Sequence, residues 1–253
     1  MAETLTPARL TLADISVAIS TGLSMLHTLP KVSVYYAAVF AVFGLILLTA
    51  IGAVGVSPMV LPFAGGFMLI GPILLTGYFE LARLHQEGEQ PELGDAFRAF
   101  GRAPGALWML ALLCAFLFLI WITDAGVLYT FTIGGADLTY DFDWLPDRAG
   151  DVLTFELWGS LMGSVLAYMI FVISAFSVPL IYEQRAGLIQ AISASARTVL
   201  GNFLVCLTWG IVLGSVIVLS ILVMPVLLFT LPVMSYASFA LYRRALPPDD
   251  QSA

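Results

Sequence analysis

The stretch VSVYYAAVFAVFGLILLTAIGAVGVSPMVLPFAGGFMLIGPILLTGYF, from Val32 to Phe79, contains no charged residue. A helix needs about 20 apolar residues to cross the hydrocarbon core of a bilayer, so this stretch is long enough for two crossings. Gly55, Pro58 and Pro62 lie near its middle, and proline is well tolerated in the first turn of a new helix. The stretch therefore predicts two membrane-spanning helices joined by a tight turn.

The composition of the whole chain also indicates a membrane protein. Of its 253 residues, 60% are hydrophobic and 11% are charged, and the mean hydropathy is +0.98. A soluble domain has about 25% charged residues. The net charge of −7 and the lack of a basic patch argue against nucleic acid as a partner. Cys114 and Cys206 lie inside apolar runs and are interpreted as small buried hydrophobic residues.

Three further uncharged stretches follow, at residues 103–123, 157–182 and 203–241. The last is again long enough for two helices, with Pro225 near its middle. The chain is therefore expected to be an all-α membrane protein with six transmembrane helices. Their expected positions are residues 32–56, 59–82, 105–128, 155–182, 201–224 and 225–242.

The basic residues predict the orientation. In the six-helix arrangement nearly all of them fall on one side of the membrane, namely Arg9, Lys31, Arg83, Arg98, Arg102, Arg185, Arg197, Arg243 and Arg244, and only Arg148 falls on the other. Because lysine and arginine are retained in the cytoplasm, both termini are expected there, in the inner membrane of a bacterial cell. The chain then divides into a cytoplasmic segment with an interfacial helix (1–31), a membrane domain (32–245) with an acidic outer loop (130–155), and a disordered cytoplasmic tail (246–253).

Short amphipathic helices are expected at residues 93–103 and 188–198 and, with a looser pattern, at 12–22. Such helices lie in the plane of the membrane interface. Each precedes a pair of spans, and the second span of each pair carries a proline followed by a tyrosine: Pro72 and Tyr78, Pro179 and Tyr182, Pro232 and Tyr236. The pattern predicts a threefold internal repeat of interfacial helix, span and span.

The segments 62–72, 78–83 and 174–185 resemble an uncharacterised family of bacterial integral membrane proteins, domain of unknown function 2189. The resemblance implies a six-span membrane protein whose role is not established, and some relatives are labelled as cytochrome c oxidase subunits. Similar proteins often have histidines in the last span, where this chain has Tyr236 and Ala240. This departure weakens a ligand role for that helix.

Few residues suit catalysis. Haem–copper chemistry needs several core histidines, but this chain has His27 and His85, both outside the expected spans. The sequence contains no phosphate-binding glycine loop or cysteine–histidine cluster, so no catalytic residue, cofactor or metal is expected. The acidic outer loop is interpreted as solvated, with a calcium site as the less favoured alternative.

Charged residues cluster at the expected ends of spans. Arg83 and Arg185 are close enough in sequence to pair with Glu80 and Glu183, either as boundary ion pairs or as part of a cytoplasmic vestibule or partner contact. The prolines are expected to kink or unwind their helices. The candidate cavity or kink residues are Gly71, Pro72, Tyr78, Glu80, Pro179, Tyr182, Glu183, Pro232 and Tyr236.

Three classes of function follow. The favoured one is a non-catalytic accessory or assembly component of a membrane complex, such as a respiratory complex, with the lipid bilayer and other membrane proteins as partners. The alternative is a transporter or channel for a small or apolar solute through a bundle with proline-broken helices. A membrane enzyme is disfavoured because the catalytic groups are missing. Small-residue pairs such as Gly210 and Gly214 are interpreted as helix packing, with a homodimer contact as the alternative.

Overall fold

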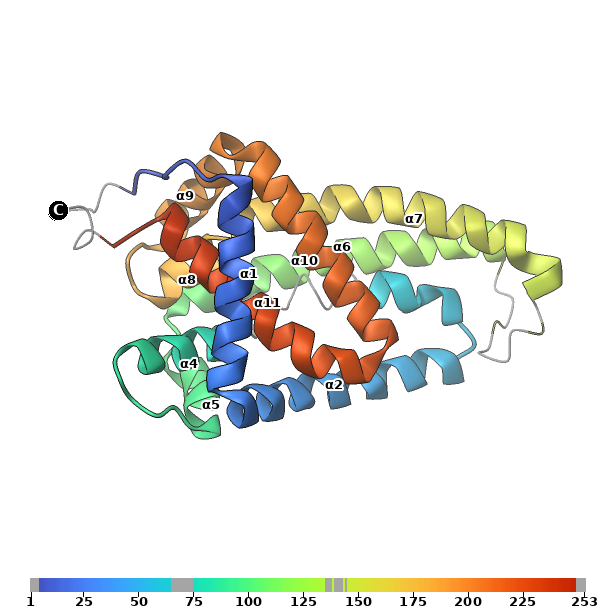
Figure 1. Ribbon diagram of the computed structural model, residues 1–253. Helices are drawn as coiled ribbons and strands as arrows, with labels where there is room; N and C mark the ends of the chain where they lie inside the picture. The colour runs from blue at the N-terminus through green and yellow to red at the C-terminus, as the bar shows by residue number, and fades with distance from the viewer. Residues whose placement is uncertain (1–4, 65–74, 135–137, 139–142, 144, 249–253) are drawn as a thin grey trace.

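The structure is a computed structural model that describes residues 5–64, 75–134, 138, 143 and 145–248. Within these residues the secondary structure is helical, apart from an isolated bridge between Val56 and Leu138. The elements are α1 (Leu12–Thr28), α2 (Pro30–Ala53), η1 (Ser57–Met59), α4 (Thr76–Gln86), α5 (Leu93–Arg102), α6 (Gly105–Ile133), α7 (Leu145–Ser174), α8 (Ser177–Tyr182), α9 (Leu188–Gly201), α10 (Phe203–Leu222) and α11 (Met224–Ala245) (Figure 1).

Among the residues that the structure describes, five helical segments are long and apolar enough to cross a membrane: Pro30–Ala53, Gly105–Ile133, Pro146–Tyr182, Phe203–Leu222 and Met224–Ala245. This confirms an all-α architecture with several membrane helices. The span expected at 59–82 is described only near its two ends, where residues 60–64 and α4 are helical. Its middle, with Gly71 and Pro72, lies outside the described residues.

Helix boundaries follow local sequence in most places. The turn expected at Pro225 lies there, because α10 ends at Leu222 and Pro225 occupies the first turn of α11. The outer loop is shorter than the predicted 130–155, since α6 continues to Ile133 and α7 already begins at Leu145. A left-handed Gly134 ends α6, and Asp147 in the first turn of α7 interacts favourably with the helix dipole.

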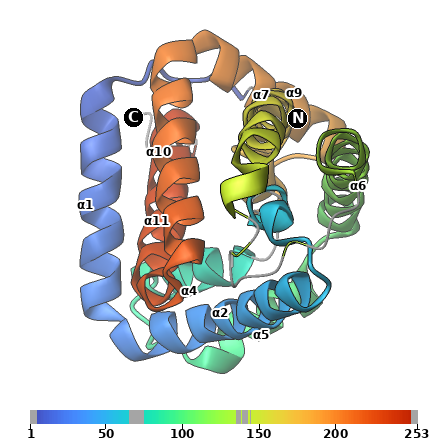
Figure 2. The ribbon, with the colours of Figure 1, turned by 90° about the vertical axis from the view of Figure 1, so that its right-hand side faces the viewer.

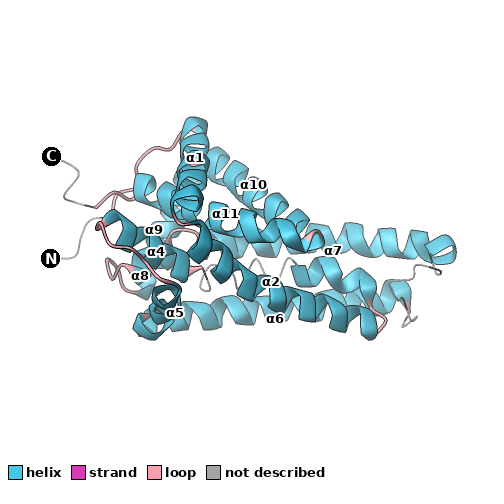
Figure 3. Cartoon of the chain, turned by 60° about the horizontal axis from the view of Figure 1, so that its bottom comes forward, coloured by secondary structure: helices cyan, strands magenta, loops and turns pink. Residues whose placement is uncertain are grey.

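Three amphipathic helices gather at one end of the bundle. The polar end is the end where α1, α5 and α9 lie together with α4 and α8 (Figure 3). Helix α1 packs along α11, α5 packs on α4, and α9 packs on α7 and α8. The view along the bundle shows α1 beside α10 and α11, far from α6 (Figure 2). Helices α1 and α9 therefore pack against membrane-spanning segments. Helix α5 packs against α4, which lies at the end of the expected second span.

The chain ends are held at the same place. The Ala8 amide donates to the Ala245 carbonyl at 2.9 Å, and Leu246 is buried. The Arg185 guanidinium donates to the Leu246 carbonyl oxygen at 2.7 Å and to the Pro247 carbonyl oxygen at 2.9 Å. The tail predicted to be disordered from residue 246 is therefore fixed at its first residues, and residues 249–253 lie outside the described part of the chain.

The two described prolines of the predicted kinks behave differently. The helix is interrupted between α7 and α8, just before Pro179, and Ser195 of α9 bridges the gap. The Ser195 hydroxyl accepts the Phe176 amide at 3.2 Å and donates to the Val172 carbonyl at 2.8 Å. Pro232 lies inside α11, which stays helical from Met224 to Ala245, so this helix is not unwound at the proline.

Candidate functional site

The polar end holds two buried carboxylates, Glu80 in α4 and Glu183 directly after α8. An ionised carboxylate is costly in a buried place unless it is paired and hydrogen-bonded. Each of these carboxylates is surrounded by arginines and a tyrosine, and at least one of these partners comes from another helix. The two clusters together make the most elaborate polar site in the described part of the chain.

Glu80 is held by groups from three helices. Arg83, one turn further along α4, donates to both carboxylate oxygens at 2.9 Å. The Tyr182 hydroxyl of α8 donates to the same carboxylate at 2.8 Å, and Nη1 of Arg102 at the end of α5 donates at 3.3 Å. These donors favour the ionised form of the carboxylate, so Glu80 is the anion of this cluster.

Glu183 is held in the same manner by the end of α11. The Tyr242 hydroxyl donates to its Oε2 atom at 2.6 Å, and Nη2 of Arg243 lies 2.6 Å from its Oε1 atom. Arg185 is more distant, with Nη1 at 4.0 Å from the carboxylate, and donates to the Tyr242 hydroxyl at 2.8 Å. The two clusters thus connect α4, α5, α8 and α11 across the polar end.

The two clusters line one pocket of about 440 Å³, which we call the arginine pocket. Its lining residues are Glu80, Arg83, Arg102, Tyr182, Glu183, Gln184, Arg185, Arg243 and Pro248. Four guanidinium groups face two carboxylates among these residues, so the lining carries an excess of two positive charges. The pocket is therefore suited to an anion.

Three of the candidate residues named from the sequence, Glu80, Tyr182 and Glu183, meet in this pocket. The ion pair expected between Glu80 and Arg83 is present. The sequence analysis missed Arg102, Tyr242 and Arg243 as partners of these carboxylates. Their one available signal was their position at predicted helix ends on the same side of the membrane.

Tyr78 and Tyr236 lie elsewhere, in an aromatic cluster between α2, α4 and α11. The Tyr78 ring contacts Tyr36 and Tyr236 edge to face, with centroids 4.9 Å and 5.3 Å away. The Tyr236 hydroxyl lies 2.8 Å from the Ser33 hydroxyl, and the Tyr78 hydroxyl donates to the Ser33 carbonyl at 3.2 Å. Both tyrosines are almost completely buried, so their side chains fill the space between these helices. They line neither the arginine pocket nor the apolar cavity described in the next paragraph.

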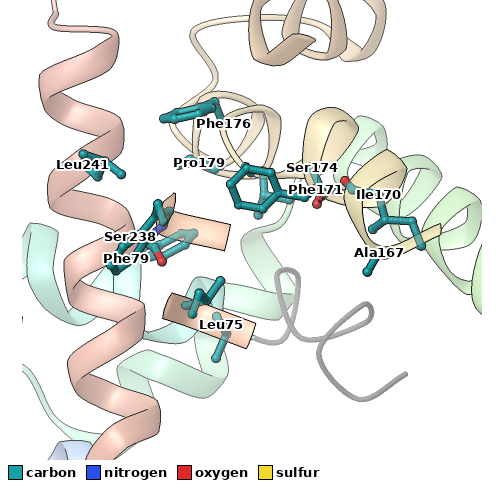
Figure 4. Close-up of a pocket in the computed structure, with 14 residues that line it drawn as sticks. Leu75, Phe79, Ala167, Ile170, Phe171, Ser174, Phe176, Pro179, Ser238 and Leu241 are labelled. Atoms are coloured by element: carbon teal, nitrogen blue, oxygen red, sulfur yellow. Dashed lines mark hydrogen bonds between the residues drawn. The ribbon is translucent and has the colours of Figure 1, made fainter. Parts of the chain in front are cut away.

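Pro179 lines a separate apolar cavity of about 80 Å³ (Figure 4). Its walls include Phe79 of α4 and Phe171 of α7, and the break between α7 and α8 forms one side. The hydroxyls of Ser174 and Ser238 also line it, but each donates to a carbonyl of its own helix at 2.8 Å. The cavity therefore offers little polar recognition. Pro232 is buried in α11 and lines neither this cavity nor the arginine pocket.

The histidines and metal-binding residue types are dispersed. His27 lies in the last turn of α1 and His85 in the last turn of α4, and neither lines the arginine pocket. In residues 5–64, 75–134, 138, 143 and 145–248, no group of three or more His, Cys, Asp or Glu residues could hold a metal ion. The chemistry available in the arginine pocket is thus charge pairing and hydrogen bonding.

Comparison with known protein families gives a match over about half of the chain. Residues 60–183 match the model of a family described as "Predicted integral membrane protein (DUF2189)". No curated protein and no solved structure matches the chain. The matched segment begins near the start of the expected second span (residues 59–82) and ends at Glu183. It therefore includes both buried carboxylates, Glu80 and Glu183. Over this segment the chain is similar to the DUF2189 family of integral membrane proteins.

Proposed function

We propose that the protein is a non-catalytic, multi-pass inner-membrane protein that acts as an accessory or assembly component of a larger membrane complex. The observation that carries the proposal is the way in which Glu80 and Glu183 are held. Each carboxylate contacts an arginine and a tyrosine from a neighbouring helix: Arg102 and Tyr182 for Glu80, Arg243 and Tyr242 for Glu183. Groups held in this way stabilise the arrangement of helix ends and are poorly placed to act as a general acid or base.

The topology that we propose with this role has six spans, with both termini in the cytoplasm. The second span would run through residues 59–82 and end in α4. The distribution of arginines supports this orientation, since Arg83, Arg102, Arg185 and Arg243 all lie at the polar end. The packing of α5 on α4, of α9 on α8 and of α1 on α11 supports a threefold repeat. In this repeat each amphipathic helix packs on the last helix of the preceding unit, and the third unit takes this place for the first.

Transport of a small apolar solute is the second candidate. It is favoured by the break between α7 and α8 and by the apolar cavity beside it. The packed tyrosines count against it, because Tyr78 and Tyr236 fill the bundle between α4 and α11. A solute would have to displace this aromatic cluster to pass along that route.

The accessory role is tested by purification of the tagged full chain in a mild detergent, followed by mass spectrometry and a molar-mass measurement. We expect a stoichiometric partner to co-purify. An unrelated six-span protein with the same tag and expression level is the control for nonspecific capture. Recovery of the chain alone, with the mass of a monomer or homo-oligomer, contradicts the proposal. Uptake of an apolar solute by proteoliposomes of such a preparation would favour transport.

The topology is tested by labelling with an impermeant maleimide. Cys114 and Cys206 are fully buried, so the parent chain gives a low background. Asp147→Cys lies at the end opposite the polar end and should be labelled in intact spheroplasts. Glu89→Cys lies in the exposed loop between α4 and α5 and should be labelled only after lysis. The reverse pattern contradicts the orientation, and labelling of both from one side contradicts the span count.

A further inference from the structure

The described lining of the arginine pocket contains four guanidinium groups and two carboxylates, and Glu87, outside this lining, also pairs with Arg83. Glu80 is already satisfied by Arg83 and Tyr182, yet Arg102 also points to it with one longer contact of 3.3 Å. The Arg102 side chain remains 64% exposed and the Arg83 side chain 35% exposed. Since a guanidinium has five N–H donors, most of the donors of Arg102 are available to a ligand.

Arg243 contributes a buried donor that has no partner among the described residues. One of its terminal nitrogens is paired with Glu183, but its Nε atom is buried and has no hydrogen-bond partner among the described residues, and the Oε1 atom of Glu183 is likewise buried without a hydrogen bond. A buried N–H without an acceptor is costly and uncommon in proteins. Its location in the lining of the arginine pocket places an unsatisfied donor next to an excess of positive charge.

We propose that the arginine pocket binds a phosphate-bearing anion. Guanidinium groups match phosphate oxygens with paired N–H donors, and arginine is the residue of choice for such recognition. A phosphate monoester carries close to two negative charges near neutral pH, which balances the excess of the lining. Glu80 and Glu183 hold Arg83 and Arg243 in fixed orientations, so the site is organised before the ligand arrives.

The position of the pocket suits a lipid headgroup as well as a free phosphate. It lies at the ends of α4, α8 and α11, where apolar helices give way to charged residues. Basic pockets between membrane helices bind phosphorylated headgroups at this depth. The chemistry is the same for both sources, and the proposal does not depend on the accessory role.

The test measures binding to the full chain reconstituted in phosphatidylcholine nanodiscs at constant salt. Inorganic phosphate is titrated by calorimetry, and phosphatidic acid is added to the bilayer and counted by native mass spectrometry. We expect saturable binding of at least one of these probes. Retention of phosphatidic acid alone assigns the site to a headgroup, whereas binding of inorganic phosphate alone assigns it to a soluble anion.

The variant Arg102→Gln is the principal probe, because this side chain is largely exposed and its loss leaves the contacts of Glu80 with Arg83 and Tyr182 intact. It should weaken binding about tenfold or more. Arg197→Gln is the matched control, since Arg197 lies on α9 outside the pocket and bonds only a backbone carbonyl in the described structure. Equal weakening by both variants would indicate nonspecific attraction and overturn the proposal.

Asp249 and Asp250 follow Pro248 of the pocket lining in the sequence. The full-length variant Asp249→Asn/Asp250→Asn is therefore titrated in parallel, because their carboxylates can compete for the same arginines. Tighter binding in this variant, still lost with Arg102→Gln, agrees with the proposal. Absence of saturable binding in both the parent chain and this variant overturns it.

Discussion

Gly22 of α1 lies directly against the backbone carbonyl of Val233 in α11, so closely that a β-carbon on Gly22 would overlap its oxygen. The obstacle is a backbone atom inside a helix, which cannot move aside as a flexible side chain can. The close approach is what lets α1 pack along the length of α11, and it explains why the most N-terminal amphipathic helix lies beside the last membrane helix.

We therefore predict that Gly22→Ala separates α1 from α11 and destabilises the folded protein by about 1–3 kcal/mol, a typical cost of overpacking. Thermal unfolding in detergent, followed by tryptophan fluorescence, should show a lower midpoint. Gly101→Ala on α5 is the control, because a β-carbon there meets nothing within 4 Å. That control should leave stability unchanged or raise it slightly through helix propensity. Equal midpoints for the two variants would contradict the importance of the close approach.

Glu80 provides a second test at the polar end. Glu80→Gln keeps the shape of the side chain but removes the charge that Arg83 and Tyr182 contact. We expect a loss of about 1–3 kcal/mol, towards the lower end because Arg83 and Arg102 are partly solvated. Glu87→Gln is the matched control: Glu87 bonds the same Arg83 at 2.7 Å, but it is 49% exposed. A larger loss for Glu87→Gln than for Glu80→Gln would show that burial does not strengthen this contact.

The same residue predicts a pH dependence. Because the donors of Arg83 and Tyr182 favour the ionised carboxylate, the Glu80 charge stabilises the folded protein where the carboxyl is ionised. This stabilisation is lost as the carboxyl becomes protonated at low pH. The melting temperatures of the parent chain and Glu80→Gln should therefore differ at pH 7, and the difference should shrink as the pH falls below about 4.5.

Part of the acid sensitivity will remain in the Glu80→Gln variant. The pKa values of Asp14 and Asp95 are lowered, chiefly by side-chain hydrogen bonds from Thr11 and Arg98 respectively. Both carboxylates will become protonated at low pH. The informative quantity is thus the difference between the two melting curves at each pH. A difference that stays constant from pH 7 down to about pH 3 would contradict the role of the Glu80 charge.

Local sequence predicted the helices well because each depends on the residues it contains. The apolar stretches give α2, α6, α10 and α11, and the amphipathic patterns give α5 and α9 within a few residues. The Glu80–Arg83 pair was predictable for the same reason, since both residues lie one turn apart on one helix. Helix α1 is longer than predicted: the amphipathic pattern indicates a helix over residues 12–22, whereas the helix continues to Thr28.

Contacts between segments that are distant in the sequence could not be predicted from local sequence. The partners of Glu80 on α5 and α8 and of Glu183 on α11 depend on which helix ends meet in the bundle. Proline effects were also set by the surroundings. Ser195 satisfies the backbone at the break before Pro179, whereas α11 accommodates Pro232 within a continuous helix. Residue type alone does not distinguish these two cases.

Asn202 gives a final prediction, on the N-terminal segment. This residue follows α9, and its amide side chain accepts the Leu10 amide at 2.8 Å and donates to the Ala8 carbonyl at 3.1 Å. Asn202→Ala removes both bonds and should free the segment before α1, because its remaining backbone anchor among the described residues is the bond from Ala8 to Ala245. Trypsin cleavage after Arg9, followed by mass spectrometry, should be several times faster than in the parent chain. Asn202→Asp retains the acceptor for Leu10 and should give an intermediate rate. Unchanged cleavage in Asn202→Ala would mean that the burial of Leu5 and Leu10 alone holds the segment in place.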